Sequence, residues 1–242
     1  MLPAMAAEAE RGVAVVTGGG SGIGREVARE LARRGHPLAL LGRRPEALAE
    51  TLAEVGAAEG LALPCDVRNP AAVAAAAAEI ERRFGAAQVL VPAAGVARIQ
   101  PLEATAPEDF AAVVETNLSG VFHVLHAFLP AMRQRGRGWI FPLLSVAARK
   151  GFPGWSAYCA SKWGLAGLVA SLREELAGSG IKLTALYPGA TDTPIWDGAP
   201  GSWNRAAMVR PEEVARAVAW TLDADPGTLV EEIHQGPAGG AL

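Results

Sequence analysis

Three side chains in the second half of the sequence have the types and spacing needed to move a proton. Tyr158 and Lys162 are four residues apart in a stretch that is predicted to be helical, so the phenol and the ammonium lie on one face, about one turn apart. A free phenol has a pKa near about 10, and a nearby cation favours its ionised form, which makes the group a better acid or base at neutral pH. Ser145 lies thirteen residues before Tyr158, and its hydroxyl could hold a carbonyl oxygen while Tyr158 delivers the proton. Taken alone, a Tyr and a Lys at this spacing are also typical of a solvated helix face.

A glycine-rich turn near the N-terminus is the second feature with chemical potential. Residues 17–24 read Thr-Gly-Gly-Gly-Ser-Gly-Ile-Gly and follow a short apolar run. Glycines allow a tight turn and let a diphosphate approach main-chain amides at the start of a helix. The spacing of Gly18, Gly22 and Gly24 differs from the G-x-G-x-x-G fingerprint of dinucleotide sites, so an ordinary turn is the alternative. With a strand before it and a helix after it, the turn favours a nucleotide site, whose candidate contacts are Gly18, Gly20, Ser21, Gly22, Ile23 and Gly24.

The second apolar run ends in Gly42, Arg43 and Arg44, where a site for the free ribose of NAD would place a carboxylate. No carboxylate is present at this position. A guanidinium offers a planar fork of donors that suits a 2′-phosphate, so Arg43 favours NADP(H) over NAD(H). The alternative is that both arginines are the solvated start of the next helix, which is what we expect of Arg44.

These residues must be positioned by a regular alternation of short aliphatic runs and long alanine-rich stretches. Such an alternation is typical of repeated βα units on a parallel sheet. We therefore expect an α/β fold, a Rossmann-type doubly wound parallel sheet of about seven strands with helices on both faces. One domain is expected over residues 1–242, with a flexible extension at 1–11 and a loop over the substrate at 187–207. The expected strands are 12–17, 37–41, 61–65, 88–91, 139–144, 181–186 and 228–233.

Composition narrows the functional classes. The chain has 242 residues, half of them apolar, and a formal net charge of −3, which does not favour a nucleic-acid partner. No uninterrupted apolar run approaches the roughly 20 residues of a membrane-spanning helix, so no membrane partner and a cytoplasmic location are expected. The two cysteines, Cys65 and Cys159, form neither a disulfide framework nor a metal-ligand pattern, so no metal site is expected.

Further residues fall into a fixed order along the chain. The order is the glycine turn, Asp66, Asn117, Ser145, Tyr158, Lys162 and Pro188-Gly189. In this combination the sequence resembles the short-chain dehydrogenase/reductase family in its compact form, over nearly the whole chain. The most specific stretches are 17–24, Thr116-Asn117-Leu118-Ser119-Gly120, 145–162 and Pro188-Gly189-Ala190-Thr191-Asp192-Thr193.

The resemblance implies a role for each of these residues. Tyr158 is implied to be the general acid and base, Ser145 to fix the substrate oxygen, and Lys162 to perturb Tyr158 and hold the nicotinamide ribose. Asn117 is similar to the residue that, in this family, kinks its helix and positions a water linking Lys162 to solvent. A buried asparagine that only satisfies the backbone is the alternative. The other implied cofactor contacts are Asp66 and Val67 at the adenine, Ala94 and Gly95 beside the fourth strand, and Pro188, Gly189, Thr191 and Thr193 at the nicotinamide end.

Two prolines depart from the family pattern. The fourth strand usually runs into Asn-Asn-Ala-Gly, but here Pro92, Ala93 and Ala94 precede Gly95. The fifth strand often has an asparagine where this chain has Pro142. Proline donates no ladder hydrogen bond and is unusual inside a sheet. We therefore expect Pro92 and Pro142 to form a matched pair on neighbouring strands.

The resemblance implies an oxidoreductase that interconverts a carbonyl group and a primary or secondary alcohol, and Arg43 adds the expectation that it depends on NADP(H). Two alternatives stay open: an NAD-dependent alcohol dehydrogenase, and a non-catalytic NADP(H)-sensing or scaffold protein, which the altered stretch 91–95 makes conceivable. The family usually pairs its two long helices, here those beginning near Pro107 and Trp155, across a two-fold axis. A homodimer or homotetramer is therefore expected.

The loops expected around the substrate are apolar. They contain Phe152, Trp155, Ile195, Trp196 and Trp203, which favour a hydrophobic ketone or aldehyde. No cluster of Arg or Lys accompanies them, so carrier-bound substrates are disfavoured. The alternative is that these aromatic side chains seal the core or a subunit interface.

Overall fold

The computed structural model describes residues 11–56, 59–197 and 199–240. The N-terminal extension expected at 1–11 lies, apart from Arg11, outside these residues. A six-stranded parallel sheet has the order β3-β2-β1-β4-β5-β6. Its strands are β1 (Ala14–Thr17), β2 (Leu38–Gly42), β3 (Gly60–Pro64), β4 (Val89–Pro92), β5 (Gly138–Ile140) and β6 (Ile181–Leu183). The Rossmann-type α/β fold predicted from the alternation is confirmed.

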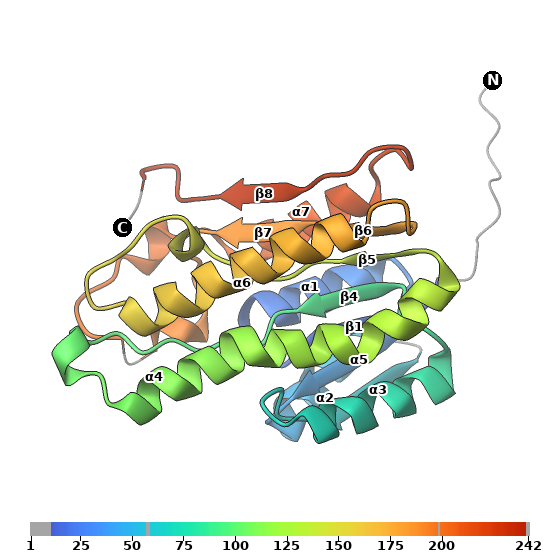
Figure 1. Ribbon diagram of the computed structural model, residues 1–242, viewed down its shortest axis with the longest axis horizontal. Coiled ribbons are helices and arrows are strands. Elements are labelled where there is room, and N and C mark those ends of the chain that lie inside the picture. The colour runs from blue at the N-terminus through green and yellow to red at the C-terminus, as the bar shows by residue number, and fades with distance from the viewer. Residues whose placement is uncertain (1–10, 57–58, 198, 241–242) are drawn as a thin grey trace.

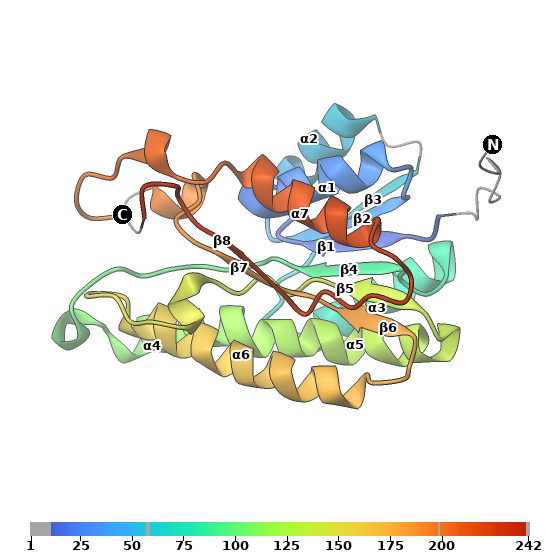
Figure 2. The ribbon, with the colours of Figure 1, turned by 90° about the horizontal axis from the view of Figure 1, so that it is seen from above.

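Helices cover both faces of this sheet (Figures 1 and 2). One face is covered by α1 (Gly22–Arg33), α2 (Pro45–Val55) and α7 (Pro211–Leu222). The other is covered by α3 (Pro70–Phe84), α4 (Pro107–Val114), α5 (Gly120–Arg135) and α6 (Ser156–Glu175). Proline occupies the first position of α2, α3, α4 and α7, where its missing N–H has no helical partner to lose.

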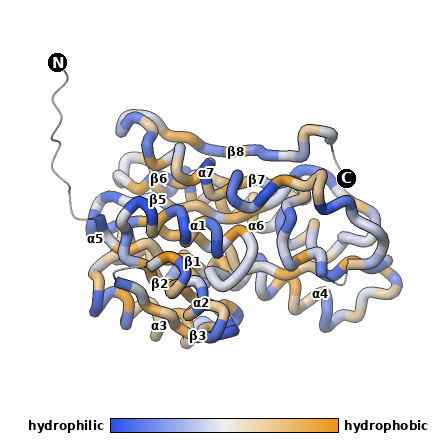
Figure 3. Tube along the Cα trace, turned by 180° about the vertical axis from the view of Figure 1, so that it is seen from behind, coloured by the Kyte–Doolittle hydropathy of each residue, from blue (hydrophilic) through white to orange (hydrophobic). Residues whose placement is uncertain are grey.

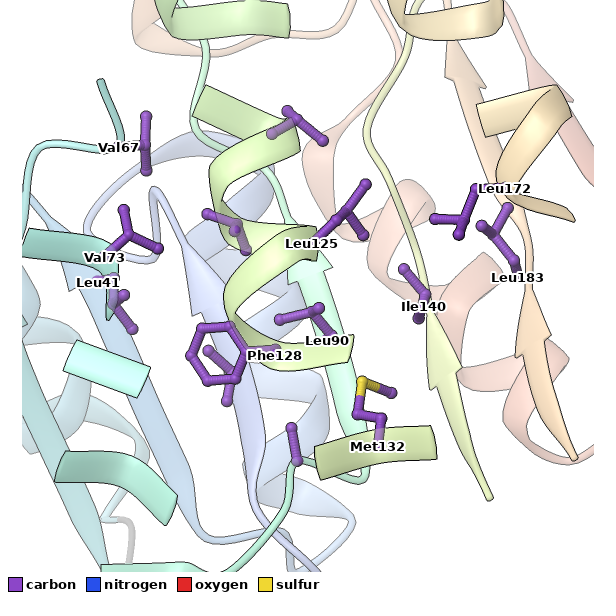
Figure 4. Close-up of a cluster of buried hydrophobic side chains, with 14 of the residues drawn as sticks. Leu41, Val67, Val73, Leu90, Leu125, Phe128, Met132, Ile140, Leu172 and Leu183 are labelled. Atoms are coloured by element: carbon purple, nitrogen blue, oxygen red, sulfur yellow. The ribbon is translucent and has the colours of Figure 1, made fainter. Parts of the chain in front are cut away.

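Each face of the sheet has its own hydrophobic core. Figure 3 shows hydrophobic residues along β1, with hydrophilic stretches on the outer helices. The core under α3, α5 and α6 includes Leu90, Phe128, Met132 and Ile140, all fully buried. Figure 4 shows Phe128 and Met132 projecting from α5 toward the strands. The sheet is therefore buried on both faces, as the near-continuous apolar strands require.

The expected sixth strand, 181–186, is divided in two. Ile181–Leu183 forms β6, whereas β7 (Ala185–Pro188) pairs with β8 (Glu232–Gln235). Leu186 accepts a hydrogen bond from Leu144 N–H at 2.8 Å and donates one to Pro142 O at 3.0 Å. In that parallel register the missing N–H of Pro142 would have donated to the Thr184 carbonyl, so the ladder is interrupted at this residue.

Pro92 and Pro142 lie opposite each other on neighbouring strands. The β4–β5 register pairs Leu90 with Ile140, and two residues further along it reaches the two prolines. Leu143 N–H donates to Pro92 O at 3.2 Å, which continues the same register. Both prolines are buried. The matched pair therefore has the placement that the sequence predicts, at the end of the sheet where the strands lead into the site loops.

The stretch Pro107–Arg135 is long and apolar enough, by composition alone, to cross a membrane. Here one side of it packs in the core, with Val113, Val124 and Phe128 buried. A π-helical turn, Glu115–Ser119, separates α4 from α5. The stretch is thus a core helix of the α/β fold. The π turn interrupts what the sequence predicts as one long helix beginning near Pro107.

Candidate active site

A cavity of about 450 Å³ opens at the carboxyl ends of the parallel strands. This is the edge at which doubly wound sheets bind ligands. The cavity brings together most of the predicted site residues from segments far apart in the sequence. They are Gly18, Ser21, Gly22, Ile23, Gly24, Ala94, Gly95, Ser145, Tyr158, Lys162, Pro188, Gly189, Thr191 and Thr193.

The glycine turn has the conformation and crowding that only glycine allows. Gly18 and Gly22 have φ values of +70° and +53°. A Cβ on Gly18 would lie 3.0 Å from the Ala94 backbone, and a Cβ on Gly24 would overlap the carbonyl oxygen of Gly18. The turn is therefore folded on itself and pressed against the end of β4, with its amides at the start of α1.

The N-terminus of α1 is left free for an anion. Ser21, the N-cap, makes no side-chain capping hydrogen bond, and the first turn of the helix contains no acidic residue. Free amides at a helix N-terminus bind phosphate groups well. The turn opens into the same cavity as Tyr158 and Lys162. These observations fit a dinucleotide that extends from the glycine turn to the proton-transfer residues.

Replacing Gly24 with alanine should weaken dinucleotide binding by about tenfold or more, because the new methyl group displaces the Gly18 carbonyl from the phosphate turn. The dissociation constant can be measured by fluorescence titration with NADPH. Gly167→Ala is the matched control, since a Cβ at Gly167 meets no atom within 4 Å. Equal affinity in the Gly24→Ala and control proteins would contradict a phosphate site at this turn.

Thr17 is a site residue that the sequence analysis did not identify. Its hydroxyl accepts hydrogen bonds from the N–H groups of Ala93 and Ala94, both at 3.1 Å. These amides belong to the stretch where the family's asparagines are missing. Thr17 thus fixes the end of β4 beside the glycine turn, and a hydroxyl at the last residue of β1 was the available signal.

Tyr158, Ser145 and Lys162 meet on one wall of the cavity. Tyr158 and Lys162 lie in the first turns of α6, and Ser145 follows the interrupted end of β5. Lys162 Nζ donates to the carbonyl oxygen of Leu143 at 2.7 Å and lies 5.6 Å from the centre of the Tyr158 ring. The Ser145 hydroxyl accepts the Ala147 N–H at 3.1 Å, which orients its oxygen. The predicted trio is therefore assembled, with the Leu143 carbonyl as an additional partner that no sequence pattern indicated.

The expectation that Lys162 lowers the pKa of Tyr158 is wrong for this structure. Burial raises the pKa of the Tyr158 phenol to about 12, although its interaction with Ser145 acts in the opposite direction. Burial also lowers the pKa of the Lys162 ammonium to about 7. Loss of solvation is the largest cause of both shifts, since each charged form is disfavoured in the cavity wall. At neutral pH the phenol keeps its proton and can donate it.

The Asn117 side chain is buried in the π turn and does not line the cavity. Its Nδ2 donates to the carbonyl of Val96 at 2.8 Å and to the Ser161 hydroxyl at 3.0 Å, and its Oδ1 accepts the Val96 N–H at 2.8 Å. Both amide hydrogens are thereby used. The side chain clamps the backbone just after Gly95, which matches the structural alternative, and the water relay to Lys162 stays a prediction.

Four predicted cofactor contacts lie outside the cavity. Gly20 faces Ala47 behind the turn. Val67 is buried in the core beneath Gly120. The Asp66 carboxylate binds the Arg68 guanidinium at 2.6 Å, and this ion pair lowers the pKa of Asp66.

The fourth of these contacts, Arg43, follows β2, whose register pairs Gly42 with Pro64 of β3. Its side chain is exposed and has no hydrogen bond or ion pair among the described residues. Arg43 is close enough to Asp66 to contribute to lowering that group's pKa. The two residues therefore share the edge where the adenosine end of a dinucleotide is expected.

Aromatic side chains form one wall of the cavity, as the sequence predicts. Trp155 packs edge-on against both Tyr158, with ring centres 5.4 Å apart, and Trp196, at 5.5 Å. Trp203 lies 4.7 Å from Trp196. Phe152 and Ile195 also line the cavity. The aromatic residues of these loops therefore face the site rather than the interior of the sheet.

The loop that follows β7 is tied into a defined shape. Arg205 binds Asp192 at 2.5 Å and Asp197 at 2.7 Å, and donates to the carbonyl of Thr193 at 2.9 Å. Trp196 Nε1 donates to the carbonyl of Thr191 at 2.9 Å. The loop that the sequence places over the substrate is thus positioned by an ionic cluster, with Thr193 against Gly22 of the glycine turn.

Among the other cavity residues that were not predicted, two groups stand out by their chemistry. Gly236, Pro237 and Gly240 reach the cavity because β8 pairs with β7, and Gly189 N–H donates to Gln235 O at 2.6 Å. Lys150 also lines the cavity. The Gly- and Pro-rich end of the chain was a signal for the first group, whereas the position of Lys150 depends on loop packing.

The chain is similar to known proteins in sequence and in structure. Residues 12–200 match the family described as short chain dehydrogenase. The 2-dehydro-3-deoxy-L-rhamnonate dehydrogenase (NAD(+)) of Sphingomonas sp. is 40% identical over 78% of this chain and 76% of its own. The sepiapterin reductase of Chlorobaculum tepidum is 35% identical over 95% of this chain and 98% of its own. The alcohol dehydrogenase of the archaeon Thermococcus sibiricus, solved with 5-hydroxy-NADP, is similar in structure with a TM-score of 0.87 and 31% identity, covering 96% of this chain and 99% of its own.

Proposed function

Because the chain belongs to the short-chain dehydrogenase family and is an oxidoreductase of carbonyl and alcohol groups, we propose that it uses NADP(H) in preference to NAD(H) on a hydrophobic small molecule. The observation that carries the proposal is one cavity that joins a free helix N-terminus to a buried Tyr158 and Lys162 and to an aromatic wall. A bound nicotinamide cofactor supplies or accepts the hydride in such a reaction.

The residues of this chain supply the binding groups and the proton. Ser145 binds the carbonyl oxygen, and Tyr158 Oη donates its proton to that oxygen as the carbonyl is reduced. In the reverse direction the ionised form of Tyr158, the phenolate, takes the proton from the alcohol and becomes the neutral phenol again. The high pKa of Tyr158, about 12, keeps this proton available at neutral pH for reduction.

The same cavity has groups suited to each part of the cofactor. Lys162, which has donors left after its bond to Leu143, would hold the nicotinamide ribose together with Tyr158. The amides of the glycine turn would hold the diphosphate. Pro188, Gly189, Thr191 and Thr193 would hold the nicotinamide end. Asp66 and Val67, which lie outside the cavity, stay the residues predicted for the adenine end.

The preference for NADP(H) depends on Arg43. Its exposed guanidinium, without a partner in the described chain, stands at the end of β2, where the 2′-phosphate would lie. The 5-hydroxy-NADP bound to the Thermococcus relative also favours the phosphorylated cofactor. The NAD(+) in the name of the Sphingomonas relative favours the alternative, in which Arg43 is only a surface charge.

Arg43→Ala should weaken NADPH binding by about tenfold or more and leave NADH binding unchanged, because only NADPH has the dianion that the guanidinium would bind. Fluorescence titration of both cofactors measures this difference. Arg44→Ala, also exposed at the start of α2, is the matched control. If both cofactors bind equally well before and after the Arg43 change, the preference for NADP(H) is contradicted, and Arg43 is only a surface charge.

Turnover of a panel of hydrophobic aldehydes, ketones and alcohols tests catalysis itself. NADPH consumption with at least part of the panel supports the enzyme, whereas tight NADPH binding without turnover supports the non-catalytic alternative.

The cytoplasmic location and the homodimer or homotetramer stay predictions. Half-exposed Phe122 on α5 and Trp163 on α6 are consistent with paired helices.

A further inference from the structure

Lys150 is the one charged side chain on the aromatic side of the cavity, as far as the structure describes the chain. It follows the short 3-10 helix η3 (Val146–Ala148) and precedes the loop to α6. Its ammonium lies 4.8 Å from the centre of the Phe152 ring, another cavity residue. A cation over an aromatic face is held without being neutralised, so it can still attract an anion.

The backbone of Lys150 is anchored on both sides. Its N–H donates to Val146 O at 3.2 Å, and its carbonyl accepts a contact from Cys159 Sγ at 3.9 Å. Cys159 is the residue next to Tyr158. The base of the Lys150 side chain is therefore fixed relative to the proton donor.

No acidic residue of the described chain lines this cavity. The carboxylates of Asp192 and Asp197 in the neighbouring loop are paired with Arg205. The other cavity cation, Lys162, is buried and bonded to Leu143. Lys150 thus faces the site without a carboxylate partner among the described residues, in a setting that favours an anionic ligand.

Composition adds an independent point. The sequence has 22 basic residues, of which only Lys150, Lys162 and Lys182 are lysines. Two of these three line the cavity. A lysine ammonium is a compact charge on a flexible stem, which reaches a carboxylate at the edge of a pocket more freely than a planar guanidinium.

We propose that Lys150 determines substrate specificity, an inference that rests on the proposed function. The enzyme then acts on aromatic or cyclic hydrophobic carbonyl compounds that bear a carboxylate, or a similar anion, away from the reacting carbon. The tryptophan wall packs the ring, Ser145 and Tyr158 bind the carbonyl oxygen, and Lys150 binds the distal anion.

Three para-substituted benzaldehydes test the proposal: the carboxylate, its neutral methyl ester and the cationic trimethylammonio compound. Wild-type protein and Lys150→Met are compared by kcat/KM with NADPH, so that the intrinsic reactivity of each aldehyde cancels in the ratio of the two proteins. Lys150→Met should lower kcat/KM for the carboxylate by about three- to tenfold, leave the ester nearly unchanged and raise the value for the cation.

Two matched variants complete the design. Lys150→Arg keeps the charge and should keep most of the preference for the carboxylate. Lys182→Met makes the same chemical change where the ammonium bonds to the carbonyls of Asp225 and Thr228, away from the cavity, and should have no effect. An equal loss for all three aldehydes in Lys150→Met, or a weaker affinity for NADPH, would overturn the proposal, because Lys150 would then act on folding or on the cofactor.

A binding experiment separates this inference from the proposed function. Trp155, Trp196 and Trp203 line the cavity, so tryptophan fluorescence can report binding of para-(hydroxymethyl)benzoate and of its methyl ester without any turnover. The benzoate should bind more tightly than the ester to wild-type protein and equally to Lys150→Met. If no aldehyde is turned over but this binding preference holds, the proposed function fails and the anion site stands. If turnover occurs but neither assay depends on Lys150, the inference fails and the proposed function stands.

Discussion

Tyr158→Phe should lose turnover by about a thousandfold or more and keep its affinity for NADPH within about twofold. The change removes only the hydroxyl, and a positioned general acid contributes roughly two to four orders of magnitude to the rate. The phenyl ring can keep its edge-on packing against Trp155, where the ring centres are 5.4 Å apart. Binding should therefore survive while chemistry is lost.

The chain provides a matched control for this experiment. It contains two tyrosines, and the second, Tyr187, is buried on β7 with its hydroxyl 3.1 Å from Arg149 and 3.2 Å from Glu232. Tyr187→Phe removes the same atom outside the cavity and should keep its turnover. Steady-state NADPH consumption and NADPH titration on both variants give the comparison. Appreciable turnover by Tyr158→Phe would remove Tyr158 from its role as the acid.

Lys162→Met should also abolish turnover, and it should make the cofactor-free protein more stable at low pH. In the folded protein the pKa of Lys162 is lowered from 10.5 to about 7. Between these two values the unfolded chain binds more protons than the folded chain, so the stability of the wild-type protein rises with pH across this window. Below about pH 7 the cost of burying the ammonium is present in full.

The expected advantage of Lys162→Met near pH 6 is on the order of 2–4 kcal/mol in the free energy of unfolding, after the loss of the bond to Leu143 is subtracted. This advantage should shrink steadily as the pH rises toward about 10. Urea unfolding of both proteins at several pH values, without cofactor, measures it. A pH-independent difference would mean that Lys162 is not desolvated as the structure indicates. Lys182→Met is the matched control, because it removes a lysine whose ammonium bonds to backbone carbonyls outside the cavity.

Much of the fold could be predicted because the hydrophobic pattern alone specifies it. The apolar runs at 12–17 and 37–41 became β1 and β2, and the prolines at positions 45 and 107 begin α2 and α4. The division of the sixth strand could not be predicted from its own residues. It follows from Pro142 on another strand, whose missing N–H interrupts the ladder at Thr184.

The assembly of the site was also predictable, but its electrostatics were not. Spacing on a helix brings Tyr158 and Lys162 together, and the glycine turn opens into the same cavity. The direction of the two pKa shifts depends on how much water is removed from each group, which spacing does not reveal. Lys150 likewise reaches the cavity through the packing of the loop between η3 and α6.

The crystal structure of the protein with NADP⁺ tests the central claim most directly. We predict the diphosphate against the amides of Gly18 to Gly24, the 2′-phosphate at Arg43, and the nicotinamide ribose within hydrogen-bonding distance of both Tyr158 Oη and Lys162 Nζ. The ring should lie open toward the tryptophan wall. A cofactor whose nicotinamide points away from Tyr158 and Lys162, or one that binds outside this cavity, would contradict the account.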